Sequence, residues 1–283
     1  MKKAISISSF PPGCPLDRCL GWAKEAGFQG FELELSEQGS VNLRSDPAEL
    51  QRVRMQVETA GLEVSGLATG LYWEFSATSG DPTIREHAAH VLRRQIECAA
   101  GLGVSAILVV PGAVGVDFLP SAEEVAYDLA WERAREFILA ALPLAEEQGV
   151  RIGVENVWNK FLLSPLEMRA FIDSFESPSV RSWFDVGNVL ATGYPEHWIP
   201  ILGARIVAVH LKDYRRAVGT AAGFVDLLSG DVNWPAVMQA LRAIDYHGWL
   251  TAEMIPPAPF YKHGPEILVA NTSRAMDRLL AFI

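Results

Sequence analysis

The stretch "EEQGVRIGVEN", residues 146–156, changes character at Gly149. Polar residues typical of a helix end come before the glycine, and a short run rich in apolar and β-branched residues follows it. Glycine at the end of a helix takes the left-handed backbone conformation that turns the chain into the next element. The stretch therefore predicts a helix end, a turn and a strand in direct succession.

The same pattern recurs along the whole chain. Six further instances occur, one of them (177–188) without a glycine at its entry, and "KAISISSF" adds a strand-like run at the start. These stretches are residues 3–10, 25–35, 59–69, 99–110, 177–188, 202–213 and 245–254. With residues 146–156 they give eight candidate strands.

Helix-start signals lie between these strands. Asp46 and Asp81 are each followed by proline, the arrangement of an N-cap before a first helical proline. Capping-box spacing occurs at Ser121 with Glu124 and at Ser164 with Glu167. Proline in a helix interior removes a backbone hydrogen bond, so Pro143 predicts a kink or break in the helix that starts after Ser121.

Eight strands alternating with helices predict a closed (β/α)8 TIM barrel. A doubly wound sheet is the alternative, but it calls for a glycine-rich phosphate loop after the first strand. The sequence there, "SISSFPPG" at residues 6–13, is not such a loop. No linker-like or low-complexity stretch interrupts the chain, so we expect a single barrel domain over residues 1–283.

Composition narrows the class of function. The net charge of −10 argues against a nucleic-acid partner, which needs basic surface to displace counterions. No apolar run reaches the roughly 20 residues that a membrane span requires, and no apolar signal-peptide core follows the first lysines. The three cysteines fit a reducing compartment. We expect a soluble, cytoplasmic protein and leave homo-oligomer formation open.

Metal-ligand residue types end the last four predicted strands. They are Glu155 in "IGVEN", Asp185 in "WFDVGN", His210 in "VAVHLKD" and Glu253 in "LTAEM". In a barrel of this class, chemistry is located where the strands end and the following loops begin. Four neighbouring strands would thus direct three carboxylates and one imidazole at one point.

A lone carboxylate after a strand is usually a helix cap or a loop ion pair, and a lone strand histidine is usually a core residue. It is much rarer for four such residues to occupy corresponding places on four consecutive strands by chance. Three adjacent carboxylates would repel one another without a cation. The sequence therefore predicts one divalent metal ion, with Mn²⁺, Mg²⁺, Co²⁺ and Zn²⁺ all suited to this ligand set.

The recurring motifs "GFQGFELEL", "GVEN", "FDVGN", "VAVHLKD", "GDVNW" and "HGWLTAEM" cover nearly the whole chain. Through them the sequence resembles the sugar phosphate isomerase/epimerase family with the xylose-isomerase-like barrel. The resemblance implies an isomerase whose divalent ion is held by Glu155, Asp185, His210 and Glu253. It also implies that the two glutamates form the acid/base pair.

The chemistry of a ketose fits such a site. Loss of the weakly acidic proton beside the carbonyl gives an enediolate, whose charge a metal can stabilise as a Lewis acid. If Glu155 and Glu253 lie on opposite faces of the substrate, one removes the proton and the other returns one, which inverts the centre. If one glutamate does both, a 1,2-isomerisation can result, and the sequence leaves this choice open.

The resemblance also bears on the substrate. Free-ketohexose epimerases of the family carry a histidine and a second glutamate where this chain has Asn188 and, with a one-residue shift, Leu162. "DVGN" and "VAVHLKD" look more like the L-ribulose- or L-xylulose-5-phosphate 3-epimerases. A phosphate needs cations or N–H donors. Lys212, Arg215 and Arg216 follow His210 and are the predicted phosphate contacts, with solvated loop charges as the alternative for the two arginines.

Further substrate-contact candidates are Glu32, Trp73 and Trp158, together with Asn188.

Three other functions remain open. A dehydratase or lyase acting on a cyclic polyol or keto acid would use the same metal and glutamates. A DNA-repair endonuclease shares the barrel, but it uses a histidine-rich multi-metal cluster and this chain offers one histidine at its strand ends. A non-catalytic sugar-binding barrel would not need the acid/base pair.

Overall fold

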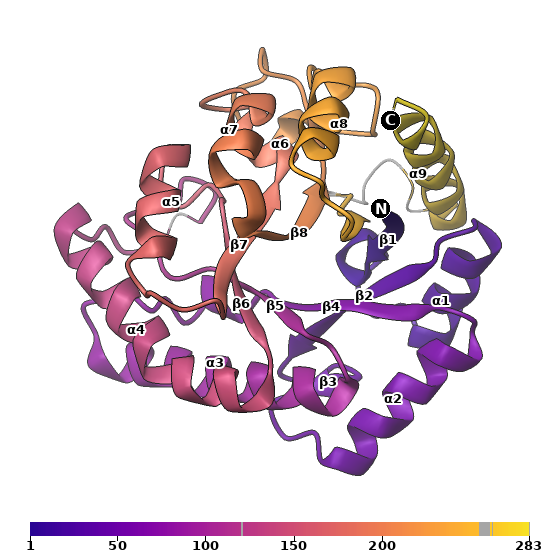
Figure 1. The fold of residues 1–283 in the computed structure, drawn as a ribbon. Coiled ribbons are helices and arrows are strands. Elements are labelled where there is room, and N and C mark those ends of the chain that lie inside the picture. Colours follow the sequence, from indigo (N-terminus) through magenta and orange to yellow (C-terminus); the bar gives the residue numbers. More distant parts are fainter. Residues whose placement is uncertain (120, 255–260, 262, 283) are drawn as a thin grey trace.

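The structure is a computed structural model that describes residues 1–119, 121–254, 261 and 263–282, and its main sheet closes into a parallel barrel (Figure 1). Each of the eight barrel strands pairs with two neighbours, and pairing of the first strand with the second completes the ring. In ring order the strands are β1 (Lys2–Ser6), β2 (Gly30–Ser36), β4 (Glu63–Thr69), β5 (Ala106–Val109), β6 (Arg151–Glu155), β7 (Val180–Asp185), β8 (Ile206–Leu211) and β11 (Trp249–Ala252). The predicted barrel and its eight strand regions are confirmed.

Helices surround this barrel, as Figure 1 shows, and alternate with the strands along the chain. They are α1 (Leu16–Glu25), α2 (Pro47–Thr59), α3 (Pro82–Leu102), α4 (Tyr127–Gln148), α5 (Pro165–Asp173), α7 (Pro195–Leu202), α8 (Trp234–Ala243) and α9 (Pro265–Leu280). Shorter elements lie in the loops: β3 (Val41–Asn42), α6 (Val186–Val189), β9 (Asp213–Tyr214), β10 (Phe224–Val225) and the 3₁₀ turns η1 (Ile7–Ser9), η2 (Leu71–Trp73), η3 (Gly203–Arg205) and η4 (Ala221–Gly223). None of the helices in the described part of the chain is long and apolar enough to cross a membrane.

Local sequence signals explain most helix boundaries. The side chains of Asp46, Asp81 and Ser164 each accept a backbone N–H of the first helical turn, as predicted. Glycines between a helix and the next strand have positive φ, among them Gly27, Gly61, Gly103 and Gly149.

The start of α4 was predicted wrongly, and the proline inside it does not break the helix. The helix does not start after Ser121 but at Tyr127, because a loop hydrogen bond from Val125 N to Val114 O (2.9 Å) holds the preceding residues out of helical geometry. The helix also runs unbroken to Gln148 with Pro143 inside it.

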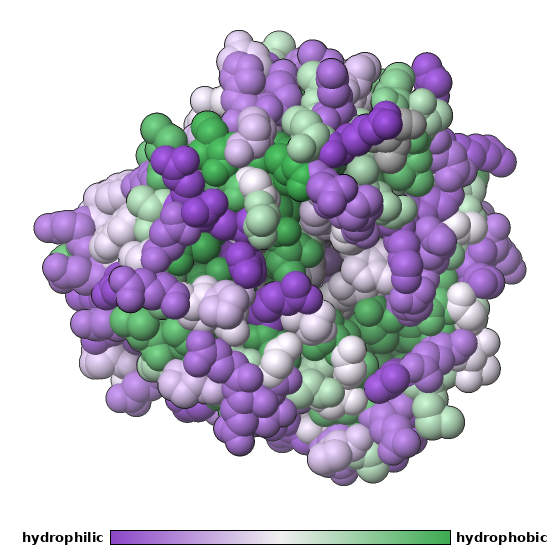
Figure 2. All heavy atoms as spheres, viewed as in Figure 1, coloured by the Kyte–Doolittle hydropathy of each residue, from purple (hydrophilic) through white to green (hydrophobic). Residues whose placement is uncertain are grey.

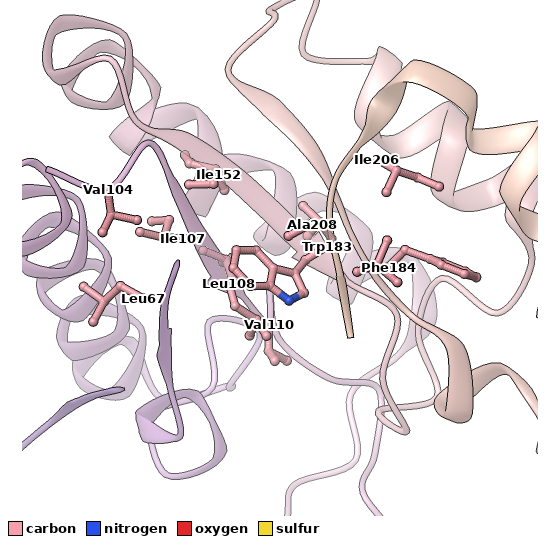
Figure 3. Close-up of a cluster of buried hydrophobic side chains, with 14 of the residues drawn as sticks. Leu67, Val104, Ile107, Leu108, Val110, Ile152, Trp183, Phe184, Ile206 and Ala208 are labelled. Carbon is pink, nitrogen blue, oxygen red and sulfur yellow. The ribbon is translucent and has the colours of Figure 1, made fainter. Parts of the chain in front are cut away.

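The barrel interior is filled around one large side chain, Trp183 of β7, which is fully buried (Figure 3). Two glycines on other barrel strands, Gly66 of β4 and Gly153 of β6, make room for it. A Cβ on Gly66 would come within 2.5 Å of the Trp183 ring, and a Cβ on Gly153 within 2.9 Å. The indole meets the imidazole of His210 edge-on, with ring centroids 5.4 Å apart. Trp183 therefore forms the apolar floor below the carboxyl ends of the strands.

Candidate metal centre

The structure brings together the four residues that the strand pattern singled out. Glu155 ends β6, Asp185 ends β7, His210 is the penultimate residue of β8, and Glu253 directly follows β11. One ligand-type atom from each lies within 4.8 Å of the others. The four strands are consecutive in the barrel, which explains why residues far apart in sequence converge.

Asp185 has two roles, because its two carboxylate oxygens face different groups. Oδ1 accepts the backbone N–H of Asn188 at 2.8 Å and so caps α6. Oδ2 is buried and has no hydrogen-bond partner among the described residues. A helix cap was the ordinary alternative for this residue, and the structure shows that the cap uses only one of its oxygens.

His210 is held from across the barrel by Glu32 of β2. The imidazole Nε2 lies 2.9 and 3.1 Å from the two Glu32 oxygens. Nδ1 faces the cluster, 2.8 Å from Glu253 Oε2, but makes no hydrogen bond of acceptable geometry with the described residues. An Nε2–H that donates to Glu32 leaves the Nδ1 lone pair free for a metal, the usual outer-shell arrangement for a ligating histidine.

The described contact of Glu32 is thus with His210, and its contact with a substrate stays a prediction. Glu32 is fully buried and its carboxylate is directed at His210. The partner of Glu32 depends on how far β2 and β8 are staggered around the closed barrel. That stagger is not visible in either strand alone.

Two asparagines support the carboxylates. The side chain of Asn156 donates to Asp185 O (2.8 Å) and accepts from Asp185 N (2.9 Å), which joins the ends of β6 and β7. Asn188, a predicted substrate contact, donates from Nδ2 to Glu155 Oε1 at 3.3 Å. Asn156 was not singled out from the sequence, although its position directly after Glu155 was the available signal. Ser8, also missed, donates to Glu253 Oε1 at 3.4 Å.

Lys212 lies inside the carboxylate cluster. Its side chain is buried, and Nζ is 2.6 Å from Glu253 Oε2, 3.0 Å from Asp185 Oδ2 and 4.0 Å from Glu155 Oε1. The backbone of α6 lies directly against it: a Cβ on Gly187 would come within 2.5 Å of the Lys212 Cβ. The ammonium is therefore directed at the predicted metal ligands, and its contact with a phosphate stays a prediction.

The three carboxylates have unequal affinities for protons. Burial raises the pKa of Glu155 to about 8, although Lys212 opposes the shift. Burial likewise raises the pKa of Asp185 against the same ammonium. Burial would also raise the pKa of Glu253, but Lys212 and His210 outweigh it and hold that pKa well below its usual range. The difference follows from distance, since Lys212 Nζ is 2.6 Å from Glu253 and 4.0 Å from Glu155.

The same carboxylates raise the pKa values of the two basic groups. Burial alone would lower the pKa of His210, but Glu32 and Glu253 raise it well above its usual value. Burial would lower the pKa of Lys212 as well, and Asp185, Glu253 and Glu155 raise it instead. The cluster thus favours positive charge at its centre.

A divalent cation fits this arrangement. The donor set is three carboxylates and one imidazole, which suits Mn²⁺, Mg²⁺, Co²⁺ or Zn²⁺. Two of the converging atoms, Asp185 Oδ2 and His210 Nδ1, are buried without a hydrogen-bond partner in the described part of the chain. Such buried polar atoms are costly unless a further partner satisfies them.

A cavity of about 500 Å³ adjoins the cluster, and none of the four predicted ligands lines it. Its wall includes Trp158 and Asn188, and the Trp158 Nε1–H donates to Asn188 O at 2.9 Å. The aromatic ring of Trp158 also packs against Tyr214 and Phe224. In the view of Figure 2, hydrophobic residues gather beside a hollow near the centre of the molecule. Trp158 is therefore placed at the edge of the site.

The remaining predicted contacts lie in loops. Trp73 packs edge-on against Phe118, with ring centroids 5.2 Å apart. Arg215 and Arg216 are exposed. The Arg215 Nε–H donates to Ser229 O at 3.1 Å, and the guanidinium of Arg216 lies 4.6 Å from the ring centroid of Tyr194. No contact in the structure tests whether any of the three meets a substrate.

Fold and site together define a (β/α)8 barrel protein with a cluster of three carboxylates and one imidazole, at the carboxyl ends of its strands, that could hold a metal ion. The profile of the Xylose isomerase-like TIM barrel family matches residues 20–271. The chain belongs to this family.

Curated relatives are named as sugar phosphate epimerases. SgbU of Escherichia coli K12, provisionally named an L-ribulose-5-phosphate 3-epimerase, is 28% identical over 82% of this chain and 81% of its own length. The L-ribulose-5-phosphate 3-epimerase UlaE of Salmonella heidelberg SL476 is 23% identical over 90% of this chain and 88% of its own.

Solved structures share the fold across the full length. A D-psicose 3-epimerase from Clostridium cellulolyticum H10 with D-tagatose has a TM-score of 0.83 and 16% identity, covering 99% of both chains. The IolI protein with a zinc atom has a TM-score of 0.81 and 15% identity, covering 99% of this chain and 98% of its own. At these identities the likeness shows the fold alone.

Proposed function

We propose that the protein is a metal-dependent epimerase of a ketose phosphate that acts through an enediolate, with Glu155 and Glu253 as the acid/base pair. The observation that carries this proposal is the placement of the two glutamates. Glu155 ends β6 and Glu253 follows β11, and the two strands between them in the barrel carry Asp185 and His210. The glutamates thus approach the centre from opposite sides, as inversion of a carbon centre requires.

In the proposed reaction, one glutamate carboxylate takes the proton from the carbon beside the ketose carbonyl. The electron pair of the broken C–H bond forms a C=C bond, and the π electrons of the carbonyl move onto its oxygen, which gives an enediolate. The other glutamate, protonated, then returns a proton to the same carbon from the opposite face. Asn188 and Ser8 hold the two carboxylates through hydrogen bonds to Glu155 and Glu253. A bound divalent ion would supply Lewis-acid stabilisation of the charge that develops on the substrate oxygens.

The proposal is tested by incubating the metal-loaded protein with L-ribulose 5-phosphate in deuterated water. Epimerisation at C3 is expected to give L-xylulose 5-phosphate with deuterium at that carbon, because the returned proton comes from a group in exchange with solvent. Loss of water from the substrate would instead identify a dehydratase. Product without deuterium would contradict the two-glutamate mechanism.

Two observations support the proposal that the substrate is phosphorylated. The curated relatives are named as epimerases of a sugar phosphate, and Arg215 and Arg216 are exposed in the loop after β8. Replacing Arg216 with Met is expected to raise KM for a phosphorylated ketose about tenfold or more, because a charge-assisted contact contributes about 1.5–3 kcal/mol. The KM for the free ketose should hardly change. Arg52→Met, an exposed arginine on α2, is the matched control. Equal effects on both substrates would remove Arg216 from the phosphate site.

A further inference from the structure

Lys212 contacts the same atoms that would bind the metal. Its Nζ lies 3.0 Å from Asp185 Oδ2, which has no hydrogen-bond partner among the described residues, and 2.6 Å from Glu253 Oε2. Glu253 Oε2 is also the oxygen that lies 2.8 Å from the inward-facing Nδ1 of His210. An ammonium and a divalent ion cannot both be within bonding distance of these few oxygens without repelling each other.

The position of Lys212 is fixed by packing as well as by charge. The side chain is only 7% exposed, and Nζ lies over the ring of Phe224, 5.8 Å from the ring centroid. The backbone of Gly187 lies close to the base of this side chain, since a Cβ on Gly187 would come within 2.5 Å of the Lys212 Cβ. The ammonium is therefore not a solvated surface charge that swings freely between partners.

We propose that Lys212 is an internal counter-cation that competes with the divalent ion for Asp185 and Glu253. This inference rests on the proposed metal site. The ammonium neutralises the buried carboxylates of the metal-free protein, so the chain stays folded without the ion. Metal binding then requires the ammonium to move away from the two oxygens, which lowers the affinity of the site for the ion.

The competing interpretation predicts the opposite change in metal affinity when Lys212 is removed. If Lys212 only held the carboxylates in position for the metal, its removal would weaken metal binding, as loss of an outer-shell partner usually does. If Lys212 competes, its removal tightens metal binding, because both the repulsion of the ion and the stabilisation of the metal-free state are lost. The sign of the change in affinity decides between the two.

The experiment is a calorimetric titration of metal-free protein with Mn²⁺, for the wild type and for Lys212→Met. We expect Lys212→Met to bind Mn²⁺ at least about tenfold more tightly, because a unit charge within a few ångströms of the ligand oxygens is removed. Thermal unfolding supplies a second readout. The metal-free variant should have a lower Tm than the wild type, and its rise in Tm on adding Mn²⁺ should be larger.

Lys3→Met is the matched control. Lys3 is as buried as Lys212 and also pairs with a carboxylate, Asp277 at 2.5 Å, but at the opposite end of β1 from the metal site. The Lys3→Met substitution should lower the Tm by the same amount with and without Mn²⁺. It should leave the affinity for Mn²⁺ unchanged. Lys212→Gln, which keeps N–H donors and loses the charge, replaces Lys212→Met if that variant does not fold.

Equal or weaker Mn²⁺ binding by both Lys212 variants would overturn the inference while leaving the metal site intact. A wild-type protein that binds no divalent ion would instead overturn the proposed metal site itself. The two failures are therefore distinct.

Discussion

Glu155→Gln and Glu253→Gln are each expected to lower kcat for epimerisation by at least about 10²-fold, the range typical of a general acid or base. Glutamine keeps the shape of the side chain and one oxygen for the metal, but it cannot take up or release the proton. The loss in kcat should therefore persist when each variant is assayed at a metal concentration that saturates its site. Turnover is measured on the metal-loaded variants, and metal content is measured in parallel by elemental analysis.

The deuterium experiment makes this prediction more specific. Each variant retains one glutamate, so proton exchange with solvent should be slow and confined to the substrate epimer whose C–H faces the surviving glutamate. Asn156→Asp, next to Glu155 in sequence, is not a suitable control because Asn156 contacts the backbone of Asp185. Glu123→Gln is suitable, since that glutamate binds Ser79 and the backbone of Gly80 in a loop. Near-normal turnover of either Glu155→Gln or Glu253→Gln would rule out the two-base mechanism.

Asp185→Asn and His210→Ala are expected to lose most of the bound metal. Each removes a buried ligand, so the loss in affinity should exceed the roughly 10–100-fold that removal of an outer-shell partner costs. Asparagine is a good N-cap residue, so Asp185→Asn should keep the start of α6 while weakening the metal site. This separates loss of the ion from loss of the fold.

Elemental analysis and Mn²⁺ titration check this prediction, with one ion per chain expected for the wild type. Asp173→Asn is the control, because Asp173 pairs with Arg205 at the surface and should not alter metal content. Undiminished metal in both Asp185→Asn and His210→Ala would show that the ion, if any, is bound elsewhere.

The sequence predicted the barrel because the signals were local and repeated. Glycines such as Gly103 and Gly149 mark the change from helix to strand, and the barrel follows from the number of such units. The four strand-end residues could be predicted for the same reason, since parallel strands in a barrel place their carboxyl ends on one face.

Contacts across the barrel could not be predicted in this way. The pairing of Glu32 with His210 depends on the stagger of strands on opposite sides of the ring, and the burial of Lys212 depends on the close approach of Gly187. The start of α4 was missed for a similar reason, because the bond between Val114 and Val125 joins two parts of a loop. Each of these features depends on a partner distant in sequence or on a loop without a repeating pattern.

The division of the Asp185 carboxylate between α6 and the cluster restricts how this protein can evolve. Oδ1 is committed to the first turn of α6 and Oδ2 faces the candidate ligands, so a change in the path of residues 186–188 also turns the carboxylate. The loop after β7 is therefore a poor place for an insertion that would alter specificity. New substrate preferences should arise more readily in the loops after β5 and β9, whose residues line the neighbouring cavity without touching Asp185.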